Sequence, residues 1–275
     1  MNRINVLDHG YVELMEVMGT DTTPAESARV SYSKGTKTVN DDRALIRYLM
    51  RHKHTSPLEM VEFKFRLKMP IFVARQHIRH RTANVNEVSY RYSVVEEEFY
   101  LPTELHRQST QNKQCSAEEL AGVDDTQENM LSWMDESADN SFDTYHALLD
   151  NNVSREIART VLPLSIYTTM IWKIDMHNLF HYLKLRLHSH AQYEIQVYAQ
   201  AMYDLIKPSF PICCEAFEDY SLYAKTFSRK EMNLLHEMLY DHYSTDIVKI
   251  WLEEDGRLSK REQDEFIDKL FGVIL

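Results

Sequence analysis

The chain has 275 residues, of which 44% are hydrophobic and 27% charged, and its formal net charge is −11. This length is enough to bury a large core in one large domain or two small ones. The acidic balance argues against nucleic acid as a partner, because proteins that bind it are usually basic. No apolar run approaches the roughly eighteen residues of a membrane span, so we expect no membrane partner.

Cysteine usage and the first residues bear on the cellular compartment. Three cysteines, Cys115, Cys213 and Cys214, are too few for a disulfide framework. Residues 1–19 lack the continuous apolar stretch of a secretion signal. Both features favour a reducing compartment, and we expect the cytoplasm. Neither Cys213 nor Cys214 has a basic neighbour in sequence, so we expect both to pack in the core.

Hydrophobic periodicity predicts strands and helices in the first eighty residues. The clearest strand covers residues 61–69, where apolar and charged side chains alternate with a period of two. Pro70 ends that strand and suits the first turn of a helix over residues 70–80. The other elements predicted in this part are a strand or hairpin at 4–18 and helices at 23–32 and 41–52.

The middle of the chain begins with a polar segment, residues 103–128, which predicts a surface insertion without a chemical role. A β-rich composition at 165–174 predicts a further strand, after which Asp175 is placed to cap a helix. Helices are predicted up to residue 150 and at 153–163, 176–188 and 191–206. We expect the α+β class, with a mixed or antiparallel sheet flanked by helices.

The tail over residues 220–275 carries two capping boxes, Ser228 with Glu231 and Ser259 with Glu262. Gly256 lies between them and is placed to end a helix. We therefore expect three short amphipathic helices here, as a helical C-terminal extension. It would pack on the body of the protein, expected as one domain at residues 1–219, or against another subunit.

Residues 75–93 concentrate four arginines and two histidines with a single glutamate. Gln76 and Arg79 share a helix flank by their spacing of three. Arg79, His80 and Arg81 fan outward, because consecutive helix positions diverge by about 100°. The planar fork of arginine suits phosphate groups and carbonyl edges. The alternative is a solvated helix end, or an ion-pair partner for the acidic run that follows.

A second group, His177, His181, Lys184 and His188, is spaced along one flank of the predicted 176–188 helix. Two histidines four positions apart can chelate a metal ion. No glutamate lies between them, however, and no third ligand is evident. Histidines that hydrogen-bond a ligand or one another fit the spacing equally well, and we expect no metal site.

Several motifs occur in a specific order. Arg79-His80-Arg81 is followed by seven residues, TANVNEV, and then by Ser89. The segments HTSPLE, REIARTVLPLSIYT and LKLRLHSHAQYEI accompany them. This ordered set resembles the flavin-dependent thymidylate synthase family over residues 3–219, and it is far more specific than one Arg-His-Arg triplet.

The resemblance implies FAD as cofactor and dUMP as substrate. The implied FAD contacts come from the Arg-His-Arg motif and the start of the 176–188 helix, and are Ser56, Arg79, His80, Arg81, Glu87, Asp175, His177 and His181. The implied dUMP contacts are Gln76, Arg79, Glu87, Val88, Ser89, Tyr90, Arg91, Arg159 and Arg186. In this family each site is assembled from several subunits of a homotetramer, which would explain why these residues are scattered along the chain.

The implied reaction is the reductive methylation of dUMP to dTMP. Its carbon donor would be 5,10-methylenetetrahydrofolate, its hydride relay FAD and its reductant NADPH. Carbon 5 of uracil must act as a nucleophile, and no cysteine here lies in an electropositive context that would activate it by addition. A cation near N3, expected to be Arg186, would polarise the ring instead, since arginine stays charged at working pH. Ser89 has no evident base beside it and is expected to bind substrate.

Two other functions remain open on the residues alone. A metal-dependent hydrolase would use His177, His181 and His188, and would contain zinc without flavin. A nucleotide- or RNA-binding module would use the arginines of residues 75–91, and its binding would depend strongly on salt. The acidic balance argues against the second alternative.

Overall fold

The computed structural model describes residues 2–31, 41–122, 125–240 and 243–271. The chain divides into two compact units, Met1–Tyr223 and Ala224–Leu275. Three predicted segments extend outside the described residues: the 23–32 helix at residue 32, the 103–128 insertion at 123–124, and the tail at 241–242 and 272–275.

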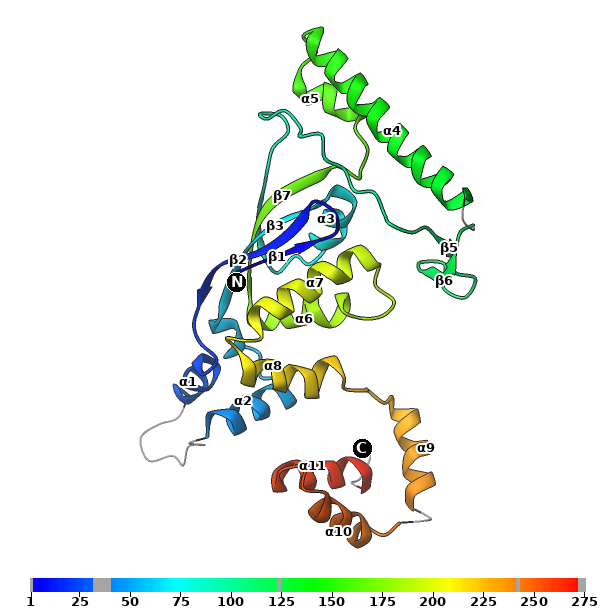
Figure 1. Cartoon of the computed structure of the whole chain (residues 1–275). Coiled ribbons are helices and arrows are strands. Elements are labelled where there is room, and N and C mark those ends of the chain that lie inside the picture. The colour runs from blue at the N-terminus through cyan, green and yellow to red at the C-terminus, as the bar shows by residue number, and fades with distance from the viewer. Residues whose placement is uncertain (1, 32–40, 123–124, 241–242, 272–275) are drawn as a thin grey trace. The chain divides into compact units, whose positions relative to one another are not determined.

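A five-stranded antiparallel sheet, in the order β1-β2-β3-β7-β4, forms the centre of the first unit (Figure 1). β3 and β7 pair along their whole lengths, from Glu62 opposite Asp175 to Pro70 opposite Tyr167. The predicted hairpin, the predicted strands at 61–69 and 165–174 and the α+β class are confirmed. The strands are β1 (Arg3–Val6), β2 (Gly10–Met18), β3 (Glu62–Pro70), β4 (Asn84–Glu87) and β7 (Tyr167–Asp175).

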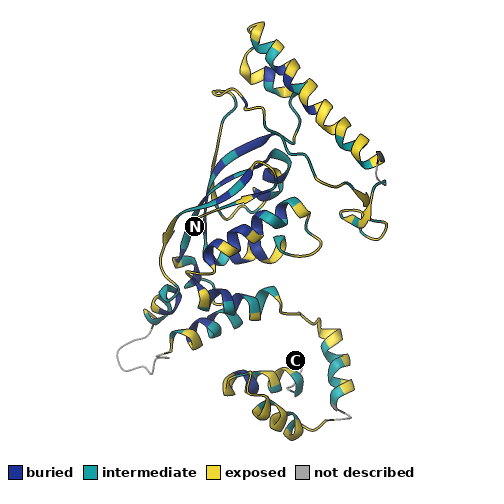
Figure 2. Ribbon diagram, viewed as in Figure 1, coloured by how far each residue is buried: buried dark blue, intermediate teal, exposed yellow. Residues whose placement is uncertain are grey.

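The alternation along β3 decides which face of the sheet is buried. Its apolar residues are completely buried, whereas the charged residues between them are half-buried. The buried face shares one core with α6 (Met176–Arg186), α7 (Tyr193–Ile206) and α8 (Pro211–Phe217), dark blue in Figure 2. Each fully buried Phe or Leu contributes about 1.5–3 kcal/mol, so this face holds the first unit together. Cys213 and Cys214 lie in that core, as expected.

A smaller cluster of buried side chains joins two further helices to the start of β7. The hydroxyl of Tyr145 accepts a hydrogen bond from the backbone nitrogen of Val95 there, at 3.1 Å. The remaining elements of this unit are α1 (Thr23–Arg29), α2 (Asp42–Arg51), η1 (Leu58–Met60), α3 (Ile71–His77), β5 (His106–Gln108), β6 (Ser116–Leu120), α4 (Asp125–Asp150), α5 (Arg155–Ala158), η2 (Arg159–Val161) and η3 (Glu218–Leu222). The predicted insertion thus contains the β5–β6 hairpin and the first turn of α4.

Two helices near the basic segment differ from prediction in where they end. α3 ends at His77 and not at residue 80, so Arg79 lies outside the helix and shares no helical flank with Gln76. α6 ends at Arg186, which places His188 in the following loop. The start of α6 is as predicted, because the Asp175 carboxylate accepts a hydrogen bond from the backbone nitrogen of Asn178 at 2.9 Å.

The second unit contains α9 (Arg229–Tyr240), α10 (Thr245–Asp255) and α11 (Lys260–Phe271), so the three predicted helices are confirmed. Both capping boxes form: Ser228 bonds reciprocally with Glu231, and Ser259 with Glu262. Gly256 ends α10 in the left-handed conformation, with φ of 68°. Over all described residues of the chain, no helix is both long and apolar enough to cross a membrane.

Candidate active site

The sheet brings the end of α6 to the end of α3, although 110 residues separate them in sequence. α3 follows the last residue of β3, and α6 follows the last residue of the antiparallel strand β7. α6 therefore begins at the opposite end of the strand pair and runs back toward α3. As a result, Nη2 of Arg186 donates a hydrogen bond to the backbone oxygen of Gln76 at 3.2 Å.

The guanidinium of Arg186 is half-buried and incompletely satisfied. Its Nε atom is buried and has no hydrogen-bond partner in the described part of the chain. A buried donor left without an acceptor costs about 1–3 kcal/mol. Such an orphan donor is open to an acceptor supplied by a ligand or by water.

His80 lies beside this arginine and is neutral. Its ring centroid is 4.8 Å from that of Tyr182 and 5.8 Å from that of His181, both on α6. Loss of solvent, and then the charges of Arg186 and His181, lower the pKa of His80 to about 4. His80 can therefore accept or donate a hydrogen bond at neutral pH without adding charge.

A buried pair supports this group, and sequence reasoning missed it. His77 is completely buried, and its Nδ1 lies 3.1 Å from the hydroxyl oxygen of Tyr182. Burial, followed by the nearby His80 and Arg186, lowers the pKa of His77 to about 3. The available signal was the helical spacing of His77 from Val73, which is also buried on α3.

Three arginines of the basic segment are exposed. The side chains of Arg75, Arg79 and Arg81 make no ion pair or hydrogen bond with any described residue. Arg79 and Arg81 follow α3 directly, where the backbone nitrogen of Arg79 donates to the oxygen of Gln76 at 3.4 Å. These two cations are therefore available to an anionic ligand.

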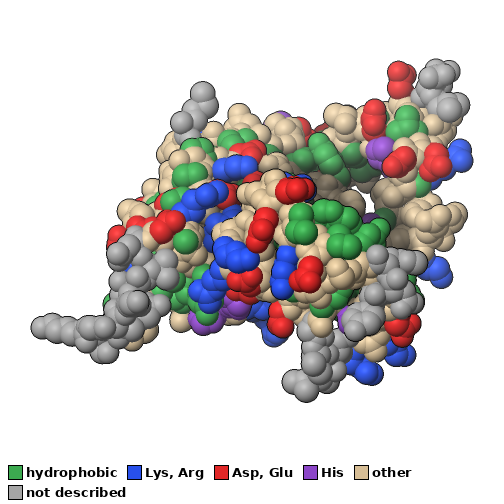
Figure 3. All heavy atoms as spheres, turned by 90° about the horizontal axis from the view of Figure 1, so that it is seen from below, with side chains coloured by type: hydrophobic (Ala, Val, Ile, Leu, Met, Phe, Trp, Pro, Cys, Tyr) green, Lys and Arg blue, Asp and Glu red, His purple; other side chains and the backbone are tan. Residues whose placement is uncertain are grey.

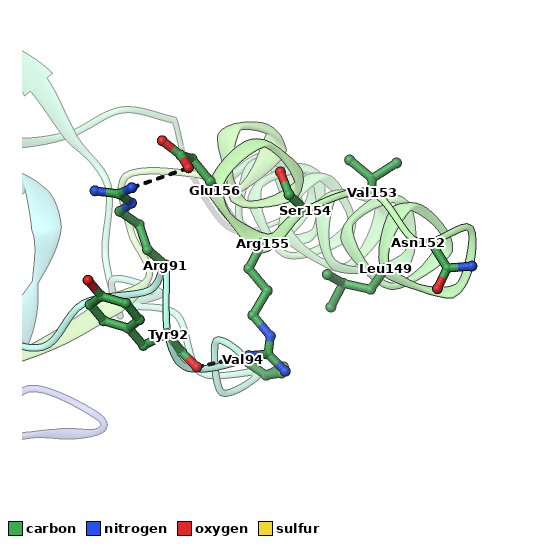
Figure 4. Close-up of a pocket in the computed structure, with 9 residues that line it drawn as sticks. All are labelled: Arg91, Tyr92, Val94, Leu149, Asn152, Val153, Ser154, Arg155 and Glu156. Carbon is green, nitrogen blue, oxygen red and sulfur yellow. Dashed lines mark hydrogen bonds and ion pairs between the residues drawn. The ribbon is translucent and has the colours of Figure 1, made fainter.

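Arg91 belongs to a different group, around a cavity of about 600 Å³ (Figure 4). Its Nη2 forms an ion pair with Oε2 of Glu156 at 3.3 Å. Across the same cavity, Nη1 of Arg155 donates to the backbone oxygen of Tyr92 at 2.9 Å. Arg159 is the first residue of η2, and its Nε donates to the backbone oxygen of Glu156 at 3.4 Å. Sequence reasoning missed Arg155 and Glu156, although both stand within four positions of Arg159.

Residues 87–90, which precede Arg91 in sequence, are held against β7 by hydrogen bonds. Thr168 donates to the carboxylate of Glu87 at 2.6 Å, and the backbone nitrogen of Val88 donates to the backbone oxygen of Thr169 at 2.9 Å. The hydroxyl of Tyr90 donates to the backbone oxygen of Tyr167. Burial, followed by nearby carboxylates, raises the pKa of Tyr90 to about 12, so this hydroxyl keeps its proton.

Ser89 occupies a turn in that segment and not a nucleophile's position. Its backbone oxygen accepts from the backbone nitrogen of Tyr92 at 3.1 Å, and its Oγ accepts from that of Arg91 at 3.4 Å. The cysteines of α8 are no better placed as nucleophiles. Both are fully buried, and burial raises the pKa of Cys213 and raises that of Cys214 to about 12.

The remaining predicted contacts lie at the start of α6 and near η1. The Asp175 carboxylate is committed to Asn178, whose side chain donates to it at 2.7 Å. His177 and His181 line a second, smaller cavity of about 180 Å³. Ser56 is exposed in the loop before η1. No group of three or more described His, Cys, Asp or Glu side chains is arranged to hold a metal ion.

The antiparallel α+β fold carries two arginine-rich groups, and arginine is a side chain that suits anionic ligands. The family model described as "Thymidylate synthase complementing protein" matches residues 13–212. The chain belongs to this family, the flavin-dependent thymidylate synthases, and the resemblance seen in the motifs is confirmed.

Two curated relatives and one solved structure show the extent of the similarity. A flavin-dependent thymidylate synthase of Thermus thermophilus is 47% identical over 269 residues, covering 98% of this chain and 96% of its own. That of Wolbachia pipientis wMel is 45% identical and covers 96% and 91%. The structure of the UMP/dUMP methylase PolB from Streptomyces cacaoi, bound with 5-Br dUMP, is 32% identical with a TM-score of 0.70. It covers 80% of this chain and 99% of its own.

Proposed function

We propose that the chain catalyses the reductive methylation of dUMP to dTMP, with 5,10-methylenetetrahydrofolate as carbon donor and NADPH as reductant. The observation that carries this proposal is Arg186, a half-buried cation with a buried Nε that lacks an acceptor among the described residues. A uracil carbonyl oxygen would supply such an acceptor, as would N3 once the ring carries negative charge. The names of the relatives support the proposal, since they are thymidylate synthases and a dUMP methylase.

Arg186 would act by stabilising negative charge on the uracil ring, which raises the nucleophilicity of carbon 5. A preorganised cation in a site of low dielectric is worth far more than one in water. The hydrogen bond to Gln76 fixes the orientation of the guanidinium before substrate arrives. Because His77 and His80 are neutral, neither adds a further positive charge beside Arg186.

The other proposed dUMP contacts would have two roles: some would bind the phosphate by charge, and the rest would complete the shape of the site. Arg91 and Arg159, beside the larger cavity, suit the phosphate as charge-assisted donors. Gln76, Arg79 and the segment Glu87–Arg91 would complete the site, with the segment held in place by its bonds to β7. In this assignment Ser89 binds substrate and does no covalent chemistry.

The residues present fit FAD as the cofactor. Arg79 and Arg81 have no acidic partner among the described residues, which suits a pyrophosphate group. The neutral His80 lies beside His181, which lines a cavity with His177, and Ser56, Glu87 and Asp175 complete the proposed set. When bound, the flavin supplies the hydride transfer that protein side chains cannot perform.

The assembly and the division of the chain are further parts of the proposal. We place the catalytic domain at residues 1–219, with 103–128 as its insertion, and a helical extension at 220–275. A homotetramer with shared sites belongs to the proposal, as the family resemblance implies. The cytoplasm remains the predicted location.

The test is product analysis with the purified protein. The protein should be yellow, with flavin near one per chain, and should convert dUMP to dTMP only when methylenetetrahydrofolate and NADPH are both present. Mass spectrometry would detect the added methyl group. A flavin-loaded protein that leaves dUMP unchanged under these conditions would refute the proposal.

A further inference from the structure

The hydrogen-bonded pair of His77 and Tyr182 lies where a polar pair is costly. Of the histidines that the structure describes, only His77 is completely buried. Other histidines are visible on the surface in Figure 3, where water can bond their ring nitrogens. Tyr182 is also completely buried, and burial raises the pKa of its hydroxyl. Polar groups removed from water in this way must find partners within the protein.

The pair is a poor device for stability alone. Nδ1 of His77 lies 3.1 Å from the Tyr182 hydroxyl, but Nε2 of the same ring is buried and has no hydrogen-bond partner among the described residues. Replacing both partners by apolar side chains of similar shape can be neutral or even stabilising. What a hydrogen bond adds to apolar packing is a fixed direction. The pair therefore favours a role in orientation.

The pair closes a ring of contacts that includes Arg186. Tyr182 and Arg186 are four positions apart on α6 and so lie on the same side of that helix. Arg186 donates to the backbone oxygen of Gln76, and that oxygen belongs to the planar peptide group that leads into His77. Within the described residues, these two contacts are the hydrogen bonds that join α3 to α6. Turning the peptide group away from Arg186 would therefore also shift His77 against Tyr182.

Aromatic contacts connect the pair to the sheet and to the basic segment. The ring of Tyr182 meets that of His80 edge to face, with centroids 4.8 Å apart and planes at 75°. The indole of Trp172, on β7, lies 4.3 Å from the His77 ring and 5.3 Å from the Tyr182 ring, centroid to centroid. The pair therefore contacts the sheet through Trp172 and the proposed active site through His80.

We propose that His77 and Tyr182 are positioning residues for the reaction on dUMP. Their hydrogen bond sets α6 against the end of α3, and it thereby holds the Arg186 guanidinium in the orientation that acts on the uracil ring. The inference rests on the proposed function for the identity of the reaction. Both residues are completely buried, so they act through Arg186 and not on a ligand. A misplacement of that group by about 1 Å can cost about a hundredfold in rate.

The decisive variant is Tyr182→Phe, because it removes only the hydroxyl and keeps the ring that packs on His80. The kcat for dTMP formation should fall about ten- to hundredfold. The KM for dUMP should change less than about threefold, since Arg91 and Arg159 are untouched. Flavin content should stay at the level of the wild type.

Tyr198→Phe is the matched control. Tyr198 is completely buried on α7, and its hydroxyl donates to the backbone oxygen of Lys68 at 2.6 Å. Each variant loses one buried hydrogen bond, so both melting temperatures should fall, by about 2–4 °C. Only Tyr182→Phe should lower kcat.

A double variant, His77→Phe with Tyr182→Phe, separates positioning from packing. His77→Phe alone leaves the Tyr182 hydroxyl buried without a partner and should have the lowest melting temperature of the set. Adding Tyr182→Phe removes that hydroxyl, so the melting temperature should rise toward that of the wild type. The kcat should stay at least about tenfold below the wild type, because the directional bond is still absent.

Three results would overturn the inference. The first is the same kcat in Tyr182→Phe and Tyr198→Phe. The second is a double variant that recovers kcat together with its melting temperature, which would reduce the pair to core packing. The third is loss of flavin from Tyr182→Phe, which would assign the pair to the cofactor site.

A probe that needs no turnover separates this inference from the proposed function. In 5-fluoro-dUMP the fluorine makes N3 more acidic, so a rise in pH gives the ring the negative charge that Arg186 would meet. Titration calorimetry should show that this rise tightens binding, relative to dUMP, in the wild type and in Tyr198→Phe but not in Tyr182→Phe. If the wild type makes no dTMP but shows this difference, the proposed function fails and the positioning role stands. If it makes dTMP without this difference, the positioning role fails.

Discussion

The two arginine-rich groups of the first unit are built differently. Arg186 is half-buried, bound to one backbone oxygen, and retains a buried donor without an acceptor among the described residues. Arg91 is about half exposed, at 53%, and its charge is already paired with Glu156. A cation removed from water can act strongly on the electrons of a bound ring, whereas an exposed paired cation can only hold and release a charged group. We therefore assign chemistry to the first group and binding to the second.

The largest expected effect comes from Arg186→Ala. Removing a preorganised donor at developing charge lowers kcat by about 10²–10³-fold. Flavin content should remain near that of the wild type, because Arg79 and Arg81 are separate cations. Single-turnover kinetics with flavin absorbance measured in parallel would check both. A variant that loses flavin as well would show that Arg186 belongs to cofactor binding.

Arg91→Ala should act on binding. Loss of one charge-assisted contact to phosphate corresponds to about 1.5–3 kcal/mol, so the KM for dUMP should rise about ten- to hundredfold with little change in kcat. Arg75→Ala is the matched control, since Arg75 is an exposed arginine of the same segment without a proposed role. An equal effect in both variants would mean that only the general charge of the segment matters.

The histidines buried beside Arg186 should also make the stability of the protein sensitive to acid. The folded chain holds His77 with a pKa of about 3 against an ordinary 6.5, so between these values the unfolded chain binds more protons. The free energy of unfolding therefore falls as the pH drops below 6.5, by up to about 1.4 kcal/mol per pH unit for this one group. His80 adds to the slope down to a pH of about 4.

Urea unfolding between pH 6.5 and about 4.5 would measure that slope. His77→Gln should flatten it by about one proton, whatever its effect on stability at neutral pH. A wild-type slope that His77→Gln does not alter would show that other groups govern acid stability.

The smallest effect is expected from Glu156→Gln, which removes the partner of Arg91. Exposed ion pairs contribute about 0.2–1 kcal/mol, so the KM for dUMP should change less than about fivefold. The direction is toward tighter binding, because the phosphate no longer competes with Glu156 for the guanidinium. Initial-rate kinetics at two salt concentrations would check this. A large loss of kcat would place Glu156 in the chemistry and remove the distinction between the two groups.

Local patterns predicted the parts of the fold that depend on neighbours in sequence. Sequence patterns correctly predicted the strand alternation in β3, the cap at Asp175 and both capping boxes of the tail. Strand β4 was not predicted, because Asn84–Glu87 lacks apolar alternation and becomes a strand only by pairing with the edge of β7.

Site geometry was least accessible to sequence reasoning. The contact of Arg186 with Gln76 spans 110 residues, and that of Arg91 with Glu156 spans 65. The family motifs identified Gln76, Arg91 and Arg186 as candidates, but they did not predict the contacts that hold these residues.

The most direct test of the account is tritium release from dUMP labelled at carbon 5. The flavin-loaded wild type and Arg186→Ala should be compared with methylenetetrahydrofolate and NADPH present. The account predicts sustained release by the wild type and a rate at least about 10²-fold lower for the variant, at equal flavin content. Equal release by both proteins would contradict the role of Arg186, and no release by either would contradict dUMP methylation itself.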